Sequence, residues 1–169
     1  MKFKTVKFKS VNSTNNKAIK MIKSGQIIPS ILIAEKQTKG KGQYGRKWIS
    51  QKDNLFMSLY YEFKSRKKLK NITKENCQII RKSLSKFFKN KIKVKPPNDL
   101  LMNQKKFCGI LQEIITHKEK KYIIIGIGIN LFKSPIIYNY PTTYMSKYCN
   151  KRINKSLVYN AIKKEYEKK

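Results

Sequence analysis

Charged and apolar residues alternate along the start of the chain, and this period of two predicts a strand over Lys2–Lys9. Two longer apolar segments, Ser30–Glu35 and Asn54–Phe63, predict buried strands. The second half of the chain predicts four more strands, Lys91–Lys95, Leu100–Met102, Phe107–Ile115 and Tyr122–Leu131. Polar residues at Asn103–Gln104 separate the second and third of these strands, and Lys118–Lys120 separate the third and fourth. Each of these two pairs of strands is therefore expected to form a hairpin.

Three segments have a helical pattern instead. Ser13 or Thr14 can cap a helix that runs to about Ile22. The segments Thr73–Phe88 and Lys155–Lys168 carry apolar residues at helical spacing, which predicts two amphipathic helices.

The order of these elements indicates the architecture. Strands that follow one another through short turns imply a sheet that is mixed but mainly antiparallel, and helices are expected to cover one of its faces. The sequence therefore predicts an α+β fold with two layers. A length of 169 residues is sufficient for one substantial core, so residues 1–169 are expected to form a single domain without an internal repeat or a linker.

Positive charge dominates the composition, because 40 lysine and arginine residues against 9 acidic residues give a net charge of +31. Dense positive charge is typical of nucleic-acid-binding proteins, since it releases counterions from phosphates. Only four of these residues are arginines, which suit phosphate oxygens better than lysines, and the lysines are spread along the whole chain. We favour a compositional bias toward Lys, Ile and Asn, with weak, non-specific attraction to polyanions. A basic nucleic-acid-binding module stays open as the alternative.

The remaining composition favours a soluble, cytoplasmic protein without a membrane partner. No apolar run approaches the roughly 20 residues of a membrane helix, and the N-terminus lacks the apolar core of a signal peptide. The cysteines Cys77, Cys108 and Cys149 stand far apart, as in proteins of a reducing compartment. A structural zinc site needs four closely spaced ligands and is not expected.

A glycine-rich, basic loop follows the second predicted strand. Gly40, Gly42 and Gly45 match the G-x-G-x-x-G spacing of dinucleotide-binding loops. That motif requires a helix to begin inside it, whereas the residues around Trp48 lead into a strand, so the dinucleotide interpretation fails. The loop also lacks the Lys-Ser/Thr of a P-loop, because Arg46 follows the last glycine. Its backbone N–H groups and positive charges can instead enclose an anion.

Five short motifs stand out along residues 11–131. They are Ser13-Thr14-Asn15, Gly40-Lys-Gly-Gln-Tyr-Gly-Arg-Lys-Trp48, Lys95-Pro-Pro-Asn-Asp-Leu100, Lys106-Phe-Cys-Gly-Ile-Leu111 followed by Glu113, and Gly126-Ile-Gly-Ile-Asn130. Each motif alone is weak. In this order they resemble the S-T-N, G-R-G-R-x-G-R-x-W, K-W-P-N-D-L, K-x-x-G-I-L-x-E and G-x-G-x-N motifs of the biotin protein ligase family, and their co-occurrence is specific.

The resemblance implies a catalytic domain like those of class II aminoacyl-tRNA synthetases. It also implies an enzyme that adenylates biotin with ATP and Mg²⁺ and then transfers biotin to a lysine of a biotin carboxyl carrier protein. The biotin-binding residues it implies are Ser13, Thr14, Asn15, Gln37, Lys41, Gly42, Gln43, Lys106 and Gly109. The implied ATP-binding or adenylate-binding residues are Arg46, Trp48, Asn98 and Asn130. The implied catalytic residues are Lys106 and Asp99, and Asp99 is also the implied magnesium ligand.

The residue types can fill these roles. Hydroxyl and amide side chains suit the ureido head of biotin, and the loop from Lys41 to Gln43 is expected to close over the ligand. Lys106 is expected to offset the negative charge that gathers during attack on the α-phosphate. Acyl adenylation needs alignment and charge neutralisation rather than a protein nucleophile.

Purely structural explanations exist for several of these residues. Ser13 or Thr14 can simply cap a helix, and Trp48 can belong to the core. Asn98–Asp99 can form a turn. The paired glycines around Ile127 can mark a bulge or a close backbone approach. The related lipoate ligases and octanoyltransferases share the expected fold, but their R-R-x-S-G-G-G and H-D-x-G-N segments do not occur here.

The chain departs from the family pattern at three positions. Gln43 replaces an arginine that the resemblance links to retention of the adenylate, so leakage of biotinyl-adenylate is expected. Pro96 replaces a tryptophan, and Lys41 keeps the charge of an arginine without its bidentate geometry. We expect neither an N-terminal winged helix nor a C-terminal β-barrel. These departures leave a decayed ligase open, and whether the chain forms a homodimer also stays open.

Overall fold

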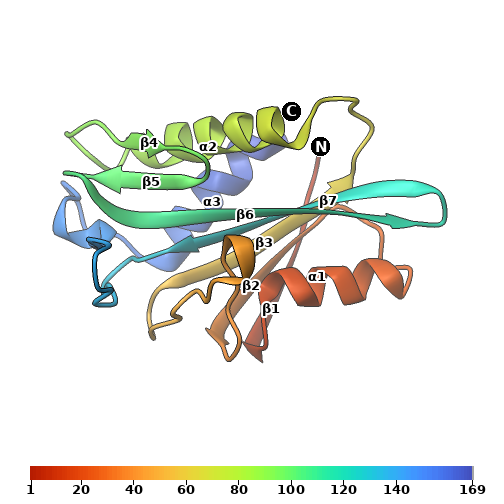
Figure 1. The fold of residues 1–169 in the computed structure, drawn as a ribbon, viewed down its shortest axis with the longest axis horizontal. Coiled ribbons are helices and arrows are strands. Elements are labelled where there is room, and N and C mark those ends of the chain that lie inside the picture. Colours follow the sequence, from red (N-terminus) through yellow and green to blue (C-terminus); the bar gives the residue numbers. More distant parts are fainter. Residues whose placement is uncertain (169) are drawn as a thin grey trace.

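The computed structural model describes residues 1–168 and contains one seven-stranded mixed sheet with three α-helices. The elements are β1 Lys4–Val11, α1 Thr14–Lys23, β2 Ser30–Gln37, β3 Leu55–Glu62, α2 Leu69–Ser85, β4 Lys93–Lys95, β5 Asp99–Met102, β6 Lys105–His117, β7 Lys120–Ile129 and α3 Lys155–Glu167, with short 3₁₀ turns at Gln43–Gly45 and Met145–Lys147. The strand order is β1-β2-β3-β7-β6-β5-β4, as Figure 1 shows. Only β1 and β2 are parallel, so the expected mainly antiparallel sheet is confirmed.

Every predicted strand and helix is present, although several ends differ. α2 begins at Leu69, four residues before the predicted start at Thr73. Both predicted hairpins are confirmed, since β5 pairs with β6 and β6 with β7 in antiparallel register. Their two central residues have positive φ, at Asn103–Gln104 and Lys118–Glu119, which is the backbone of a tight hairpin turn that follows the twist of the strands.

Helices cover both faces of the sheet, with α1 on one side and α2 and α3 on the other (Figure 1). Ile22 of α1 lies in one hydrophobic cluster with Tyr122 and Ile124 of β7. The expected two-layer arrangement, with helices on one face only, is therefore wrong. The reason lies in the apolar run of β7, because a strand that is apolar on both sides must be buried on both sides.

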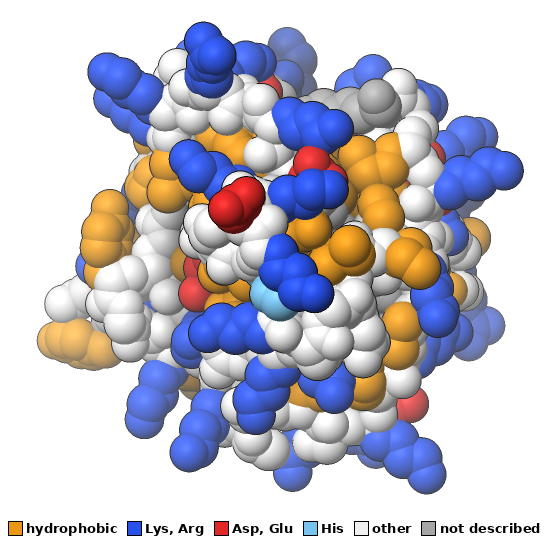
Figure 2. Space-filling model, turned by 90° about the vertical axis from the view of Figure 1, so that its right-hand side faces the viewer, with side chains coloured by type: hydrophobic (Ala, Val, Ile, Leu, Met, Phe, Trp, Pro, Cys, Tyr) orange, Lys and Arg blue, Asp and Glu red, His pale blue; other side chains and the backbone are white. Residues whose placement is uncertain are grey.

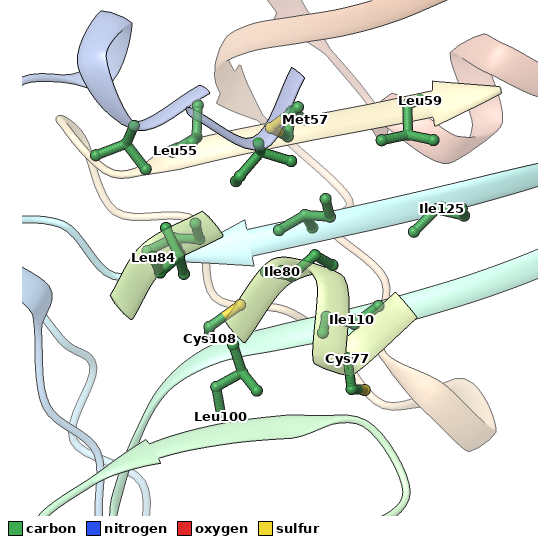
Figure 3. Packing of buried hydrophobic residues seen from close by; sticks show 14 of the residues in the cluster. Leu55, Met57, Leu59, Cys77, Ile80, Leu84, Leu100, Cys108, Ile110 and Ile125 are labelled. Carbon is green, nitrogen blue, oxygen red and sulfur yellow. The ribbon is translucent and has the colours of Figure 1, made fainter. Parts of the chain in front are cut away.

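The larger hydrophobic cluster fills the space between the sheet and the helices α2 and α3 (Figure 3). Leu55, Met57 and Leu59 alternate along β3 and belong to this cluster, together with Ile80 and Leu84 of α2. All five side chains are fully buried. The middle of this face of the sheet is therefore filled by side chains.

The alternation along β7 distinguishes the two faces of the sheet. Ile125 and Ile127 face the larger cluster. Gly126 and Gly128 face the other side, where a Cβ atom would meet Asn15 of α1 or the Trp48 ring. The glycines therefore leave a hollow on the α1 face, in the middle of the sheet.

Lysine and arginine side chains surround the molecule. Figure 2 shows them distributed around the whole visible face rather than gathered in one patch. This distribution matches the sequence, in which the lysines occur along the entire chain. Among the helices that the structure describes, none is both long and apolar enough to span a membrane.

Candidate functional site

A cavity of about 720 Å³ opens on the α1 side of the sheet. It lies over the glycines of β6 and β7 and is bounded by the start of α1, the loop 38–50 and the segment 95–99. The predicted site residues that line it are Ser13, Thr14, Asn15, Gln37, Lys41, Gly42, Gln43, Arg46, Trp48, Asn98, Asp99, Lys106 and Gly109. Apart from Gln37, these residues come from four motifs, and Gly126 and Gly128 of the fifth motif also line the cavity, so all five motifs meet in one place.

The first turn of α1 forms a neutral polar end of the cavity. Ser13 is the N-cap, since its Oγ accepts a hydrogen bond from the backbone N–H of Asn16 at 3.5 Å. The N–H of Thr14 donates to Gln37 Oε1 at 2.8 Å. Gln37 Nε2 donates in turn to Ser50 Oγ at 3.2 Å, so α1, the end of β2 and the loop 38–50 are tied together. Ser13 therefore both caps α1 and lines the cavity.

Asn15 is oriented from both ends of its amide. Ser58 Oγ donates to Asn15 Oδ1 at 2.5 Å and lies 2.7 Å from Thr14 Oγ1. Asn15 Nδ2 donates to Glu113 Oε2 at 2.7 Å. Because Asn15 and Ser58 are buried, these bonds hold a fixed pattern of hydroxyl and amide groups at this end. Such a surface suits a neutral ligand group that both donates and accepts hydrogen bonds.

The loop 38–50 is a small hairpin beside the cavity. Lys41 and Lys47 form an antiparallel bridge, and the N–H of Gly42 donates to the Arg46 carbonyl at 2.7 Å. The tip is a 3₁₀ turn in which Tyr44 has a left-handed φ of 54°. No α-helix begins in this loop, which leads into β3 instead, so its structure differs from that of a dinucleotide-binding loop.

The Trp48 ring lies directly on two glycines. A Cβ atom at Gly128 would stand 2.5 Å from Trp48 Cε2, and one at Gly109 would stand 2.7 Å from Trp48 Cζ3. The two glycines are paired across β6 and β7, so any side chain at either position would displace the ring. Trp48 Nε1 is buried without a hydrogen-bond partner among the described residues. A buried N–H without a partner is rare in folded proteins.

Lys106 supplies positive charge beside the Trp48 ring. Its Nζ lies 2.7 Å from Asp99 Oδ1 and 5.4 Å from the centroid of the Trp48 ring. The other oxygen of the Asp99 carboxylate, Oδ2, accepts a hydrogen bond from the hydroxyl of Tyr140 at 2.5 Å. Burial and this adjacent carboxylate raise the pKa of Tyr140 well above its ordinary value, so the hydroxyl stays protonated. The cavity therefore has a charged centre as well as a neutral polar end.

The two predicted nucleotide-binding asparagines lie in different places. Asn98 lines the cavity, where its Nδ2 donates to the Ile110 carbonyl at 2.7 Å. Asn130 does not line the cavity and is 2% exposed. Its Nδ2 donates to the Thr143 carbonyl at 3.1 Å, which holds the chain after β7. The structure therefore gives Asn130 a scaffolding contact rather than a place in the cavity wall.

Three cavity residues lie outside the five motifs and were not predicted. They are Ile49 in the loop 38–50 and Ile137 and Tyr140 in the segment after β7. The segment has no periodicity, and its contacts depend on tertiary structure. One signal was available, because Ile136, Ile137 and Tyr138 are consecutive large side chains outside any predicted element, and all three are exposed. Such exposure often marks a binding surface.

The arrangement does not fit Asp99 as a direct magnesium ligand. Lys106 and Tyr140 engage both of its oxygens. The described residues also contain no group of three or more His, Cys, Asp or Glu side chains that could hold a metal ion. Magnesium in such sites is usually held by substrate phosphates together with one or two carboxylates.

The fold and the cavity together define an α+β domain with an open site on the glycine-containing face of its sheet. The sequence profile of the biotin/lipoate A/B protein ligase family matches residues 7–130. The chain belongs to this family.

Known relatives agree with this assignment. The chain is 30% identical over 128 residues to the bifunctional ligase/repressor BirA of Bacillus subtilis and 32% identical over 127 residues to that of Escherichia coli, matches that cover 74% and 72% of this chain. They cover only 39% and 38% of these relatives, so the chain spans about two fifths of their length.

Solved structures extend the likeness to nearly the whole chain. The biotin protein ligase from Aquifex aeolicus in complex with biotin and ATP superposes with a TM-score of 0.81 and 27% identity, over 97% of this chain and 68% of that one. The Leishmania major ligase in complex with biotin has a TM-score of 0.79, 24% identity and coverages of 95% and 71%, and it supports the fold alone.

Proposed function

We propose that the protein is a biotin protein ligase, which activates biotin with ATP and transfers it to a lysine of a biotin carboxyl carrier protein. One observation carries the proposal: a single cavity joins the neutral polar end at Ser13–Asn15 to the charged centre at Lys106. Biotin has a neutral ureido head at one end and a carboxylate at the other. The two ends of the ligand therefore match the two ends of the cavity.

The charged centre suits the first step. A carboxylate oxygen of biotin attacks the α-phosphorus of ATP, a new O–P bond forms, and pyrophosphate leaves as the bond to the β-phosphate breaks. Negative charge gathers on the α-phosphate oxygens during this attack. Lys106 is positioned to offset that charge, while Asp99 holds its ammonium group.

The second step uses the same site. The amine of the carrier lysine attacks the acyl carbon of biotinyl-adenylate, a C–N bond forms, AMP leaves, and the amine loses a proton to solvent. Trp48 in the cavity wall and the basic loop that includes Arg46 are proposed to hold the adenylate until the carrier arrives. Magnesium is proposed only as the counterion of the ATP phosphates. A cytoplasmic location fits the three free cysteines.

The decisive assay combines the protein with Mg-ATP, biotin and a carrier domain, and measures biotin-dependent pyrophosphate release together with biotin on the carrier. Lys106→Ala is expected to lower the rate about 100- to 1,000-fold, the usual effect of removing one charge-stabilising donor. Unchanged thermal unfolding of this variant serves as the folding control. Replacing biotin with lipoate or octanoate tests the related activities, and turnover with those acids alone would overturn the proposal.

A further inference from the structure

Tyr140 occupies a position that links the segment after β7 to the charged centre. Its hydroxyl donates to Asp99 Oδ2, while Lys106 binds the other oxygen of the same carboxylate. Lys106 Nζ also lies 5.4 Å from the centroid of the Tyr140 ring. The phenol therefore contacts both members of the ion pair, one through its hydroxyl and the other through its ring.

The backbone fixes this relation. The N–H of Lys106 donates to the Pro141 carbonyl at 2.9 Å, and the N–H of Thr143 donates to the Lys106 carbonyl at 2.8 Å. The residue after Tyr140 is thus bound to the same strand residue whose side chain Tyr140 touches. This pairing holds the phenol and the ammonium group in a defined geometry.

The hydrogen bond controls how Asp99 shares its charge. The Tyr140 hydroxyl at Oδ2 fixes the orientation of the carboxylate, and the ammonium group of Lys106 meets it at Oδ1. Without that donor, both oxygens can turn toward Lys106 and hold it more tightly. An ammonium group has three N–H donors, and those not used by Asp99 are available to ligand oxygens.

We propose that Tyr140 is a positioning residue, whose hydroxyl restrains Asp99 so that Lys106 keeps donors for the phosphate or carboxylate oxygens of the ligand. The inference rests on the proposed function for its consequence in turnover, but its effect on ATP binding is independent of biotin. It requires Tyr140 to act through Asp99 and not merely as packing for Lys106.

The test is a double-mutant cycle with Tyr140→Phe and Asp99→Ala, read out as the Kd of ATP by calorimetry and as the kcat and KM of biotin-dependent pyrophosphate release. Tyr140→Phe is expected to weaken ATP binding and lower kcat about tenfold, as for one hydrogen bond to a charged group. In the Asp99→Ala background the same change is expected to have no further effect. Tyr144→Phe, on the same segment but outside the cavity wall, is the matched control and is expected to leave both quantities unchanged.

The outcomes separate the two hypotheses. Losses that add fully to those of Asp99→Ala, or a Tyr140→Phe variant that equals the wild type, would overturn the positioning role. If ATP binding shows the coupling but no biotin-dependent pyrophosphate appears, the positioning role stands and the ligase proposal fails. Thermal unfolding of each variant confirms that the protein tested is folded.

Discussion

Gly126 and Gly128 stand two residues apart on β7, and each lies beneath a different side chain of the cavity. A Cβ atom at Gly126 would come within 2.3 Å of Asn15 Oδ1, and one at Gly128 within 2.5 Å of Trp48 Cε2. Neither neighbour can yield easily, because Asn15 is held by hydrogen bonds and Trp48 is a rigid ring on a second glycine. The two glycines therefore support opposite halves of the proposed ligand.

Alanine at these two positions forms a matched pair of variants. Gly126→Ala is expected to raise the KM for biotin about tenfold and to change the KM for ATP little, whereas Gly128→Ala is expected to do the reverse. The reason is that overpacking costs about 1–3 kcal/mol at the place where it occurs. Steady-state kinetics of pyrophosphate release measures both constants. If both variants raise the same KM, the assignment of the two ends is wrong.

Cys77 provides a pH-dependent test of burial at the level of one thiol. Burial, and to a lesser extent the negative charge of Asp99, raise the pKa of Cys77 from its ordinary value of 9.0 to about 11. Between these values the folded state keeps the proton and the unfolded state loses it. The contribution of this thiol to stability is therefore full below pH 9 and is lost as the pH rises through 11.

The measurement compares denaturant unfolding of the wild type and Cys77→Ala at pH 8 and pH 10.5. The wild type is expected to be more stable at pH 8, because the thiol is fully buried and its loss leaves a cavity. This advantage is expected to shrink at pH 10.5. Because each comparison is made at one pH, titration of other groups affects both proteins equally. A difference that is constant over this range contradicts the assigned pKa.

For single residues, the sequence was sufficient to predict which residues line the cavity, but not the hydrogen bonds between their side chains. The motif residues from Ser13 to Gly109 line one cavity, because each motif combines a turn or strand end with a polar side chain. Tyr140 could not be predicted in the same way. Its bond to Asp99 joins residues 41 positions apart through a segment without periodicity, and only the folded backbone brings them together.

Among the elements, the loop 38–50 carries the departure from the family pattern that matters most. Gln43 begins the turn at its tip and lines the cavity, on the same hairpin as Arg46. A neutral side chain there removes one positive charge from a site proposed to hold an anionic adenylate.

We expect Gln43→Arg to retain the adenylate longer and so to reduce biotin labelling of non-carrier proteins several-fold, because an arginine can bind phosphate oxygens through two N–H groups. The assay incubates the enzyme with biotin, Mg-ATP and serum albumin, and follows avidin-reactive albumin. Gln43→Lys separates charge from bidentate geometry and is expected to have a smaller effect. Equal labelling of albumin by the wild type and Gln43→Arg contradicts the leakage hypothesis.

The elements themselves follow from local pattern, whereas their layering does not. Alternation and short turns were sufficient for the strands and both hairpins. The placement of α1 opposite α2 and α3 depends on which side each strand turns to the core. In β7, Ile124 faces α1 and Ile125 faces the opposite helices. The continuous apolar run of this strand is consistent with burial on both sides, but it does not identify which helix covers which side.

For the molecule as a whole, the net charge of +31 is the dominant electrostatic feature. Only five of the nine acidic residues form ion pairs among the described residues, namely Glu62, Glu75, Asp99, Glu165 and Glu167. Most lysines therefore repel one another without compensation. Such self-repulsion destabilises the compact state and is screened by salt, since the Debye length falls from about 30 Å at 0.01 M to about 10 Å at 0.1 M.

Thermal unfolding is therefore expected to shift to higher temperature by a few degrees as sodium chloride rises from 10 to 200 mM, in proportion to the roughly 2–4 °C that 1 kcal/mol represents for a domain of this size. Chloride bound at the charged centre could imitate this effect, so the same series is measured on Lys106→Ala. General repulsion predicts parallel curves for both proteins, whereas an anion site predicts that the variant responds less. A Tm that falls with salt would mean that the ion pairs outweigh the repulsion.

The same rise in sodium chloride, from 10 to 200 mM, is expected to abolish binding to a single-stranded oligonucleotide, because non-specific contacts lose counterion release as salt increases. Tight binding that persists at 200 mM would instead favour a nucleic-acid-binding role for the lysines.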